Sequence, residues 1–128
     1  MDKQVKNWII SAEYDLETAQ SMFSSKRYLY AVFMCHLSLE KILKAKVQSN
    51  IKKMPPKTHD LLYLLELSNL TIDADKKEFL TELSNISVVT RYPSDFNKII
   101  KSFSRKRTEH ILKNSKETFL WIKKYIEQ

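Results

Sequence analysis

No glycine occurs among the 128 residues of this chain, although average usage of about 7% would give roughly nine. Glycine supplies the positive φ angles that tight hairpin turns and phosphate-binding loops need. Its absence argues against β-sandwiches and β-barrels, and it excludes the P-loop and the glycine fingerprint of dinucleotide-binding folds. Since no segment sustains an alternation of apolar and polar residues, the sequence predicts an all-α fold.

The segment Tyr28–Val47 is unusually apolar, with eight consecutive apolar residues at its start and charges from Glu40 onward. As a helix it would carry one apolar face, formed by Tyr28, Ala31, Val32, Cys35, Leu39, Ile42 and Leu43. A second apolar stripe would contain Leu29, Phe33 and Leu37. Two alternatives follow: a central core helix, or a core helix that also contacts a second copy of the chain or a partner. The apolar run is too short to cross a bilayer, which needs about 20 residues.

Helical periodicity extends over most of the remaining sequence. We expect one domain over residues 1–128, folded as an all-α, up-and-down bundle of four long helices plus one short helix. Pro55 and Pro56 prevent the second helix from continuing, and Thr58 can cap the short helix after them. Asp73 or Asp75 can cap the fourth helix, and the last one begins near Ser104.

The formal net charge of +7 is concentrated in the last quarter of the chain. Residues 98–128 contain 9 Lys or Arg and 3 Asp or Glu, whereas residues 1–97 contain 13 and 12. Such a basic segment suits a nucleic acid or a nucleotide, because neutralising phosphates releases counterions. It is equally typical of a solvated helix face, so both interpretations stay open.

A cytoplasmic protein is expected, because Cys35 is the single cysteine and the N-terminus lacks the residue order of a signal peptide. The 3 histidines and the cysteine show no metal-ligand spacing, so no metal and no other cofactor are expected. Without glycine, the chain cannot form the nucleophile elbow of Ser–His–Asp hydrolases.

One polar strip does stand out on the second helix. His36, Glu40 and Lys44 are four residues apart and would share one side of it. They form either a surface ion pair with a neighbouring imidazole or the polar mouth of a groove. In the second case His36 would titrate near neutrality and serve in acid–base chemistry.

Two further candidates lie in the predicted connections. His59 follows the double proline and either fixes the loop or contacts a ligand. Tyr92 precedes Pro93 and is disfavoured from helical geometry, so residues 90–95 should form a loop that carries Arg91. Arg91 can fork two hydrogen bonds onto a phosphate or carboxylate, or it can pin the loop to Asp95 or a helix end.

Four segments together resemble one known family. The first helix has a Trp followed by A-x-x-D-L-x-x-A, and residues 27–45 contain the E-K-x-x-K-A pattern at Glu40, Lys41, Lys44 and Ala45. The pieces THDL at 58–61 and TRYP at 90–93 follow in order. In these residues the chain resembles the prokaryotic HEPN domains, named for higher eukaryotes and prokaryotes nucleotide-binding.

This resemblance implies a helical bundle that forms a homodimer and is often encoded beside a small nucleotidyltransferase. Many such pairs are toxin–antitoxin systems. Some branches are metal-independent ribonucleases that use an Arg followed four to six residues later by a His. Others bind nucleotides or RNA without catalysis.

The ribonuclease signature is incomplete in this chain. No His follows Arg91 within ten residues, which leaves Arg91 and His59 as the nearest candidate pair. Arg105 and His110 have the right spacing, but five residues along a helix subtend about 140°, so this weaker pair would not share a face.

The resemblance therefore implies a dimeric nucleotide- or RNA-binding protein, or the partner of a nucleotidyltransferase. Its expected ligand contacts are His36, Glu40, Lys41, Lys44, Arg91 and Tyr92. A metal-independent ribonuclease and a helical protein-interaction adaptor remain the alternatives.

Overall fold

The computed structural model describes residues 1–127, which form six α-helices and no strand. They are α1 (Lys3–Ser24), α2 (Tyr28–Ile51), α3 (Leu61–Ser68), α4 (Ala74–Arg91), α5 (Phe96–Ser102) and α6 (Arg105–Ile126). The all-α bundle expected from the sequence is thereby confirmed. Within the described residues, no helix is both long and apolar enough to cross a membrane.

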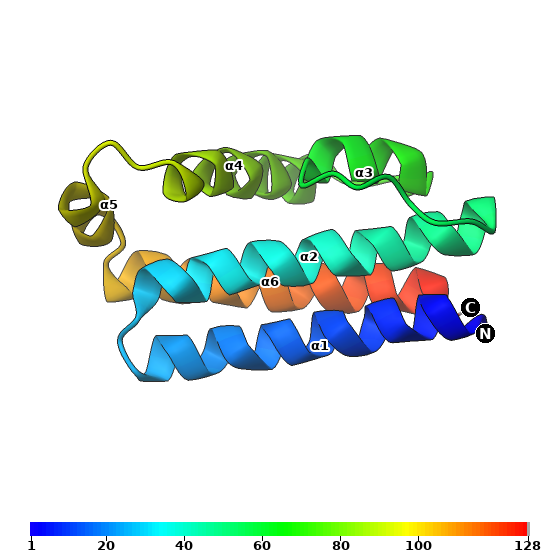
Figure 1. The fold of residues 1–128 in the computed structure, drawn as a ribbon, viewed down its shortest axis with the longest axis horizontal. Coiled ribbons are helices and arrows are strands. Elements are labelled where there is room, and N and C mark those ends of the chain that lie inside the picture. Colours follow the sequence, from blue (N-terminus) through cyan, green and yellow to red (C-terminus); the bar gives the residue numbers. More distant parts are fainter. Residues whose placement is uncertain (128) are drawn as a thin grey trace.

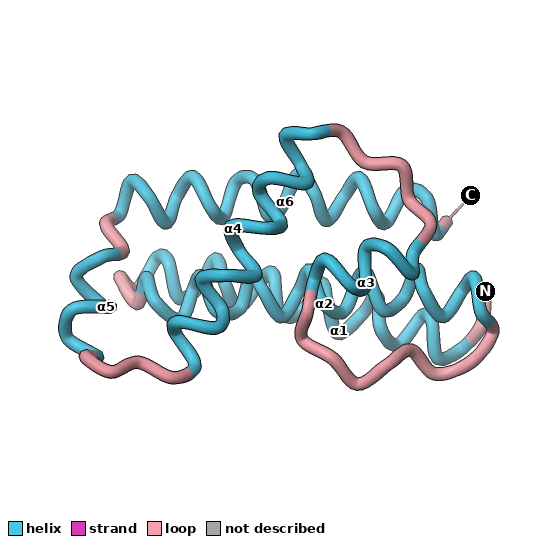
Figure 2. The backbone as a smooth tube through the Cα atoms, turned by 90° about the horizontal axis from the view of Figure 1, so that it is seen from above, coloured by secondary structure: helices cyan, strands magenta, loops and turns pink. Residues whose placement is uncertain are grey.

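Helix α2 is the centre of the fold and contacts every other helix. In Figure 1, α1 and α6 lie along one side of α2, and α3 and α4 cover the opposite side. Viewed from above, α4 runs obliquely to α1, α2 and α6 (Figure 2). Both chain termini lie at one end of the bundle, while α5 and the α1–α2 turn lie at the other (Figures 1 and 2).

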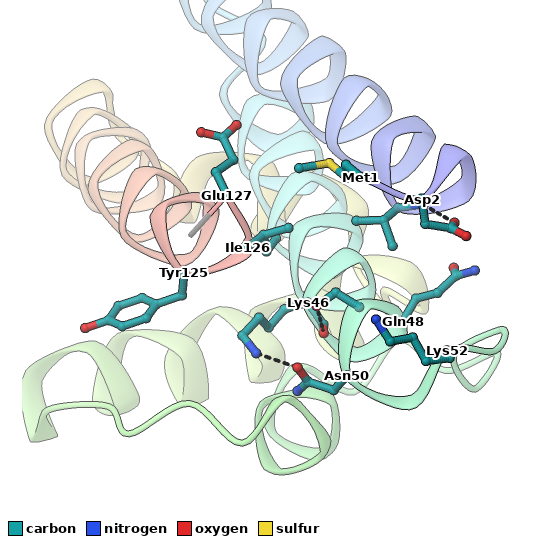
Figure 3. A pocket seen from close by; sticks show the side chains of 11 residues that line it. Met1, Asp2, Lys46, Gln48, Asn50, Lys52, Tyr125, Ile126 and Glu127 are labelled. Carbon is teal, nitrogen blue, oxygen red and sulfur yellow. Dashed lines mark hydrogen bonds between the residues drawn. The ribbon is translucent and has the colours of Figure 1, made fainter.

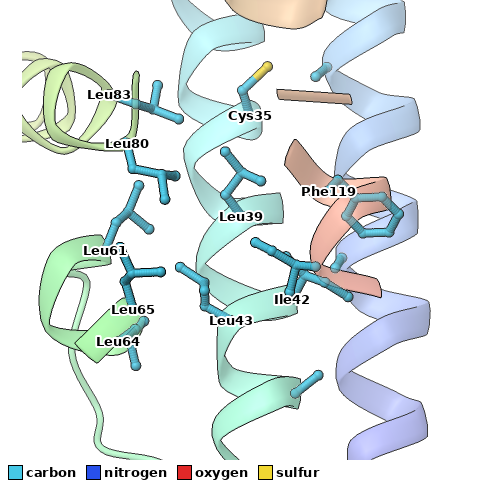
Figure 4. Packing of buried hydrophobic residues seen from close by; sticks show 14 of the residues in the cluster. Cys35, Leu39, Ile42, Leu43, Leu61, Leu64, Leu65, Leu80, Leu83 and Phe119 are labelled. Atoms are coloured by element: carbon cyan, nitrogen blue, oxygen red, sulfur yellow. The ribbon is translucent and has the colours of Figure 1, made fainter. Parts of the chain in front are cut away.

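The hydrophobic core lies on both sides of α2. Leu39, Ile42 and Leu43 are fully buried. Leu43 points toward the leucines of α3, and Ile42 points toward the side occupied by Phe119 of α6 (Figure 4). The chain itself therefore covers α2 on two sides, as a helix that is apolar almost all round requires. In the second stripe, Leu29 is buried, whereas Phe33 and Leu37 are half-buried.

The structure adds a helix that the sequence analysis did not contain. Helix α5 has seven residues, and the Asp95 side chain caps it by accepting a hydrogen bond from the Lys98 amide at 3.1 Å. Seven residues make barely two turns, too few for a helical period to be recognised. Residues 1–127 thus form four long helices and two short ones.

Two predicted boundaries were wrong. Asp60, not Thr58, caps α3, accepting hydrogen bonds from the amides of residues 62 and 63. Helix α4 continues through Arg91, because the restriction before Pro93 acts on Tyr92 alone, which leaves helical geometry at φ −132° and ψ 59°. Arg91 is therefore the last residue of a helix rather than part of a loop.

Candidate functional site

The carboxylate of Glu40 is the centre of a polar cluster between α2 and the segment before α3. Its side chain is 5% exposed. One oxygen, Oε2, accepts a hydrogen bond from Lys44 Nζ at 3.1 Å, and the other, Oε1, lies 2.8 Å from His59 Nδ1. His36 Nδ1 lies 3.9 Å from the same Oε1 atom. We call His36, Glu40, Lys44 and His59 the Glu40 cluster.

Lys44 is buried as well, which contradicts one of the two alternatives from the sequence, the surface ion pair. Its Nζ atom lies 5.6 Å from the ring centroid of Trp8 on α1, in the range of a cation–π contact. Two buried charges are stable only when each has a partner, because removing them from water costs several kcal/mol per ion. The pair therefore forms part of the core.

His36 is 1% exposed, and neither ring nitrogen has a hydrogen-bond partner within residues 1–127. Burial lowers its pKa from 6.5 to about 4; the Glu40 carboxylate raises it, and the charge of Arg91 lowers it further. The imidazole is thus neutral at pH 7. The expectation that His36 titrates near neutrality is wrong, because the sequence pattern did not show that other helices cover it.

His59 differs from His36 in its access to solvent, because its side chain is 63% exposed. The residue after it, Asp60, caps α3 and so holds this part of the connection in a defined position. Since Glu40 binds Nδ1, the tautomer with the free lone pair on Nε2 is favoured. His59 therefore presents a ring nitrogen to solvent at the edge of the cluster.

Arg91 approaches the cluster from the end of α4. Its Nε donates a hydrogen bond to Ser87 Oγ at 3.1 Å, and its guanidinium carbon lies 4.9 Å from the ring centroid of Phe33 on α2. Its buried Nη2 atom has no hydrogen-bond partner among residues 1–127. Arg91 thus contacts Phe33, whereas His59 contacts Glu40. These two residues of α2 are seven positions apart, which is about two turns, so the two predicted candidates lie along the same side of α2.

The other predicted residues lie apart from this cluster. Lys41 pairs with Asp15 of α1, with 2.7 Å between Nζ and Oδ2, and thereby ties α1 to α2. Arg105 lies over the ring of Phe23, 5.5 Å from its centroid. His110 Nε2 lies 3.1 Å from the side-chain nitrogen of Asn114 one turn along α6. Arg105 and His110 thus contact different neighbours.

Sequence reasoning missed a cavity beside Arg91. It has a volume of about 680 Å³, and its lining includes Tyr30, Phe33, Met34, Arg91, Tyr92 and Phe96. We call these six residues the aromatic pocket. They come from α2, from the end of α4 and from α5. Tyr92, named from the sequence as a contact residue, is 84% exposed at the rim. The only local signal was the density of aromatic residues on either side of Pro93.

A second cavity, of about 470 Å³, lies at the opposite end of the bundle, where both chain ends meet the end of α2 (Figure 3). Lys46 lines it and donates a hydrogen bond to Asn50 Oδ1 at 2.7 Å. None of the residues predicted to form a site line this cavity. No group of three or more His, Cys, Asp or Glu side chains within residues 1–127 could hold a metal ion.

Comparisons with known proteins agree on the family. The sequence model of the HEPN domain matches residues 5–125. The fold is similar to that of TT1696 from Thermus thermophilus, at 18% identity and a TM-score of 0.79, covering 96% of this chain and 98% of that one. It is also similar to ST0689, an archaeal HEPN homologue, at 22% identity and a TM-score of 0.78, covering 98% and 99%. A comparison with curated proteins finds no match. The resemblance seen in the sequence is thus confirmed, and the chain belongs to the HEPN domain family, whose name denotes nucleotide binding.

Proposed function

We propose that this protein binds a nucleotide or RNA through phosphate contacts from Arg91 and His59. The observation that carries the proposal is that these two side chains, far apart in the sequence, contact the same side of α2, Arg91 at Phe33 and His59 at Glu40. Arg91 retains a guanidinium nitrogen without a partner in residues 1–127, and His59 has an exposed ring. An arginine fork and a nearby imidazole are suited to phosphate oxygens.

The test is an affinity measurement with two probes, ATP and a short fluorescein-labelled single-stranded RNA. Replacing Arg91 by Ala should weaken binding about tenfold to a hundredfold, since a hydrogen bond to a charged group contributes about 1.5–3 kcal/mol. Lys76→Ala is the matched control, because Lys76 also lies over an aromatic ring, 5.3 Å from the centroid of Trp121, but at the start of α4 and outside the cluster. Unchanged affinity in Arg91→Ala, or no binding of either probe by the wild-type protein, would refute the proposal and favour a helical adaptor.

A metal-independent ribonuclease is the second candidate, and the 2.8 Å contact between Glu40 and His59 favours it. A carboxylate that holds one imidazole nitrogen leaves the other to accept a proton from a ribose 2′-OH. Arg91 would then stabilise the negative charge that develops on the phosphate. RNA cleavage that persists in EDTA and is lost in His59→Ala would support this activity. Intact RNA after prolonged incubation with the wild-type protein would exclude it.

We further propose a cytoplasmic homodimer that pairs with a small nucleotidyltransferase in a toxin–antitoxin system. Large apolar side chains exposed on α1, Ile10 and Tyr14, support a protein–protein contact. Sedimentation equilibrium should give twice the chain mass of 15.2 kDa. Expression of the chain alone should arrest growth, and co-expression with a nucleotidyltransferase encoded beside it should restore growth. A monomer without any effect on growth would contradict both parts.

A further inference from the structure

Beyond phosphate contact, the structure shows a surface suited to the bases of a nucleic acid. The aromatic pocket has a volume in the range of small-ligand sites, about 300–1,000 Å³. Four of its six defining side chains are aromatic, and Arg91 adds a guanidinium group to the lining. Tyr92 extends from the chain immediately after α4 with 84% of its surface exposed. A ring held on a short connection and left open to solvent is available for stacking.

Unpaired cations adjoin this pocket. We call Lys26, Arg27, Lys98, Lys101, Arg105 and Lys106 the basic end. All six are exposed, and none forms an ion pair within residues 1–127. They come from the α1–α2 turn, from α5 and from the start of α6, which lie at the same end of the bundle (Figures 1 and 2).

The chain also links the basic end directly to the pocket. Lys26 and Arg27 immediately precede the turn of α2 that carries Tyr30, and Lys98 follows two residues after Phe96. The acidic residue nearest in sequence, Asp95, uses its carboxylate to cap α5. Stacking side chains therefore adjoin a positively charged surface, which is the combination that binds single-stranded nucleic acids.

We propose that the aromatic pocket receives an unpaired base of a single-stranded nucleic acid whose backbone continues over the basic end. The inference rests on the proposed phosphate contact at Arg91 and specifies the form of its ligand. A duplex does not fit this assignment, because its bases are already paired and stacked and cannot reach Tyr92. The uncompensated positive charge beside the pocket favours a polyanion over an apolar protein segment as its occupant.

The first experiment compares oligouridylate, the same strand within an RNA duplex, and inorganic polyphosphate. Wild-type protein should prefer oligouridylate. Tyr92→Leu should weaken binding of oligouridylate about five- to a hundredfold, since stacking contributes about 1–3 kcal/mol per base. Its binding of polyphosphate should not change. Tyr92→Phe should bind as the wild type does, because it keeps the ring. An oligodeoxythymidylate of equal length distinguishes RNA from DNA.

The second experiment measures the salt dependence of oligouridylate binding. Each phosphate contact to a single strand contributes about 0.7 to the slope of log affinity against log salt. Lys101→Gln/Lys106→Gln should therefore reduce the slope by about 1.4. Lys3→Gln/Lys6→Gln is the matched control, because it removes the same charge at the other end of the bundle and should leave the slope unchanged.

Three results would overturn the inference. The first is equal binding of oligouridylate by Tyr92→Leu and wild type while Arg91→Ala still weakens it, which would leave the proposed phosphate contact intact. The second is equal affinity for the duplex and the single strand. The third is a mass in sedimentation that falls by half in Tyr92→Leu, which would show that a second copy of the chain covers the pocket. Failure of the wild type to bind any probe would instead refute the proposed function itself.

Discussion

At the scale of single residues, the charged members of the family pattern E-K-x-x-K-A have separate structural roles within five positions. Lys41 pairs with Asp15 of α1, whereas Glu40 and Lys44 form a buried pair with each other. A helix places successive residues about 100° apart, so neighbouring members of one motif face different elements. The motif therefore describes how α2 is held as much as what it binds.

Replacing Glu40 by Gln should lower the free energy of unfolding by about 3–5 kcal/mol, because the ammonium of Lys44 would stay buried without a charged partner. Urea denaturation followed by circular dichroism measures this loss. Glu13→Gln is the control, because Glu13 pairs with Lys123 at 3.5 Å on the surface and should cost less than about 1 kcal/mol. Equal effects of the two substitutions would show that burial of the Glu40–Lys44 pair is unimportant.

Acid should destabilise the protein through His36. The unfolded chain binds a proton at this residue near pH 6.5, whereas the folded protein binds it only near pH 4. The contribution of His36 to the free energy of unfolding is therefore fully present above pH 6.5. It decreases by about 3 kcal/mol as the pH drops to 4. The difference in unfolding free energy between wild type and His36→Gln, measured at pH 7 and pH 4, should change by this amount. A difference in unfolding free energy that stays the same at the two pH values would contradict the burial of His36.

At the scale of the elements, α2 is unusual because the rest of the chain covers nearly its whole circumference. Its apolar first half was visible in the sequence, and the structure confirms α2 as the central helix. The sequence also indicated Asp73 as one of two caps for α4, and the structure selects it. The short helices were harder to predict from the sequence. Helix α5 was not predicted, and the cap of α3 was placed two residues too early. Helix propensity and capping signals are weak over one or two turns, so the packing of a short helix decides which candidate residue caps it.

Two leucines of α2 allow the buried core to be compared with the second apolar stripe. Leu39→Ala should lower the free energy of unfolding by about 2–5 kcal/mol, because Leu39 is fully buried within the monomer. Leu37 is only half-buried, so Leu37→Ala should cost about 1 kcal/mol. Denaturation at several protein concentrations checks this prediction. A loss at Leu37 as large as that at Leu39, and dependent on protein concentration, would mean that a second copy of the chain covers Leu37.

At the scale of the whole molecule, the basic charge and the candidate site become parts of one surface. The sequence located the positive charge in residues 98–128 but left open whether it binds anions or only faces solvent. In the structure, the part of this charge on α5 and the start of α6 joins Lys26 and Arg27 at one end of the bundle, beside the aromatic pocket. The charge that follows along α6 lies away from that end, where the solvated interpretation still applies.

The sequence by itself determined the helical class, the central helix and the family, because these depend on local periodicity, missing glycines and short motifs. Only the tertiary structure decided that the Glu40–Lys44 pair is buried, that His36 is neutral, and that Arg91 and His59 lie along the same side of α2. The physical reason is that a helical period orients a side chain only about its own helix axis. Which other helix then covers that side chain depends on how the helices pack, and the residue pattern of a single helix does not determine this packing.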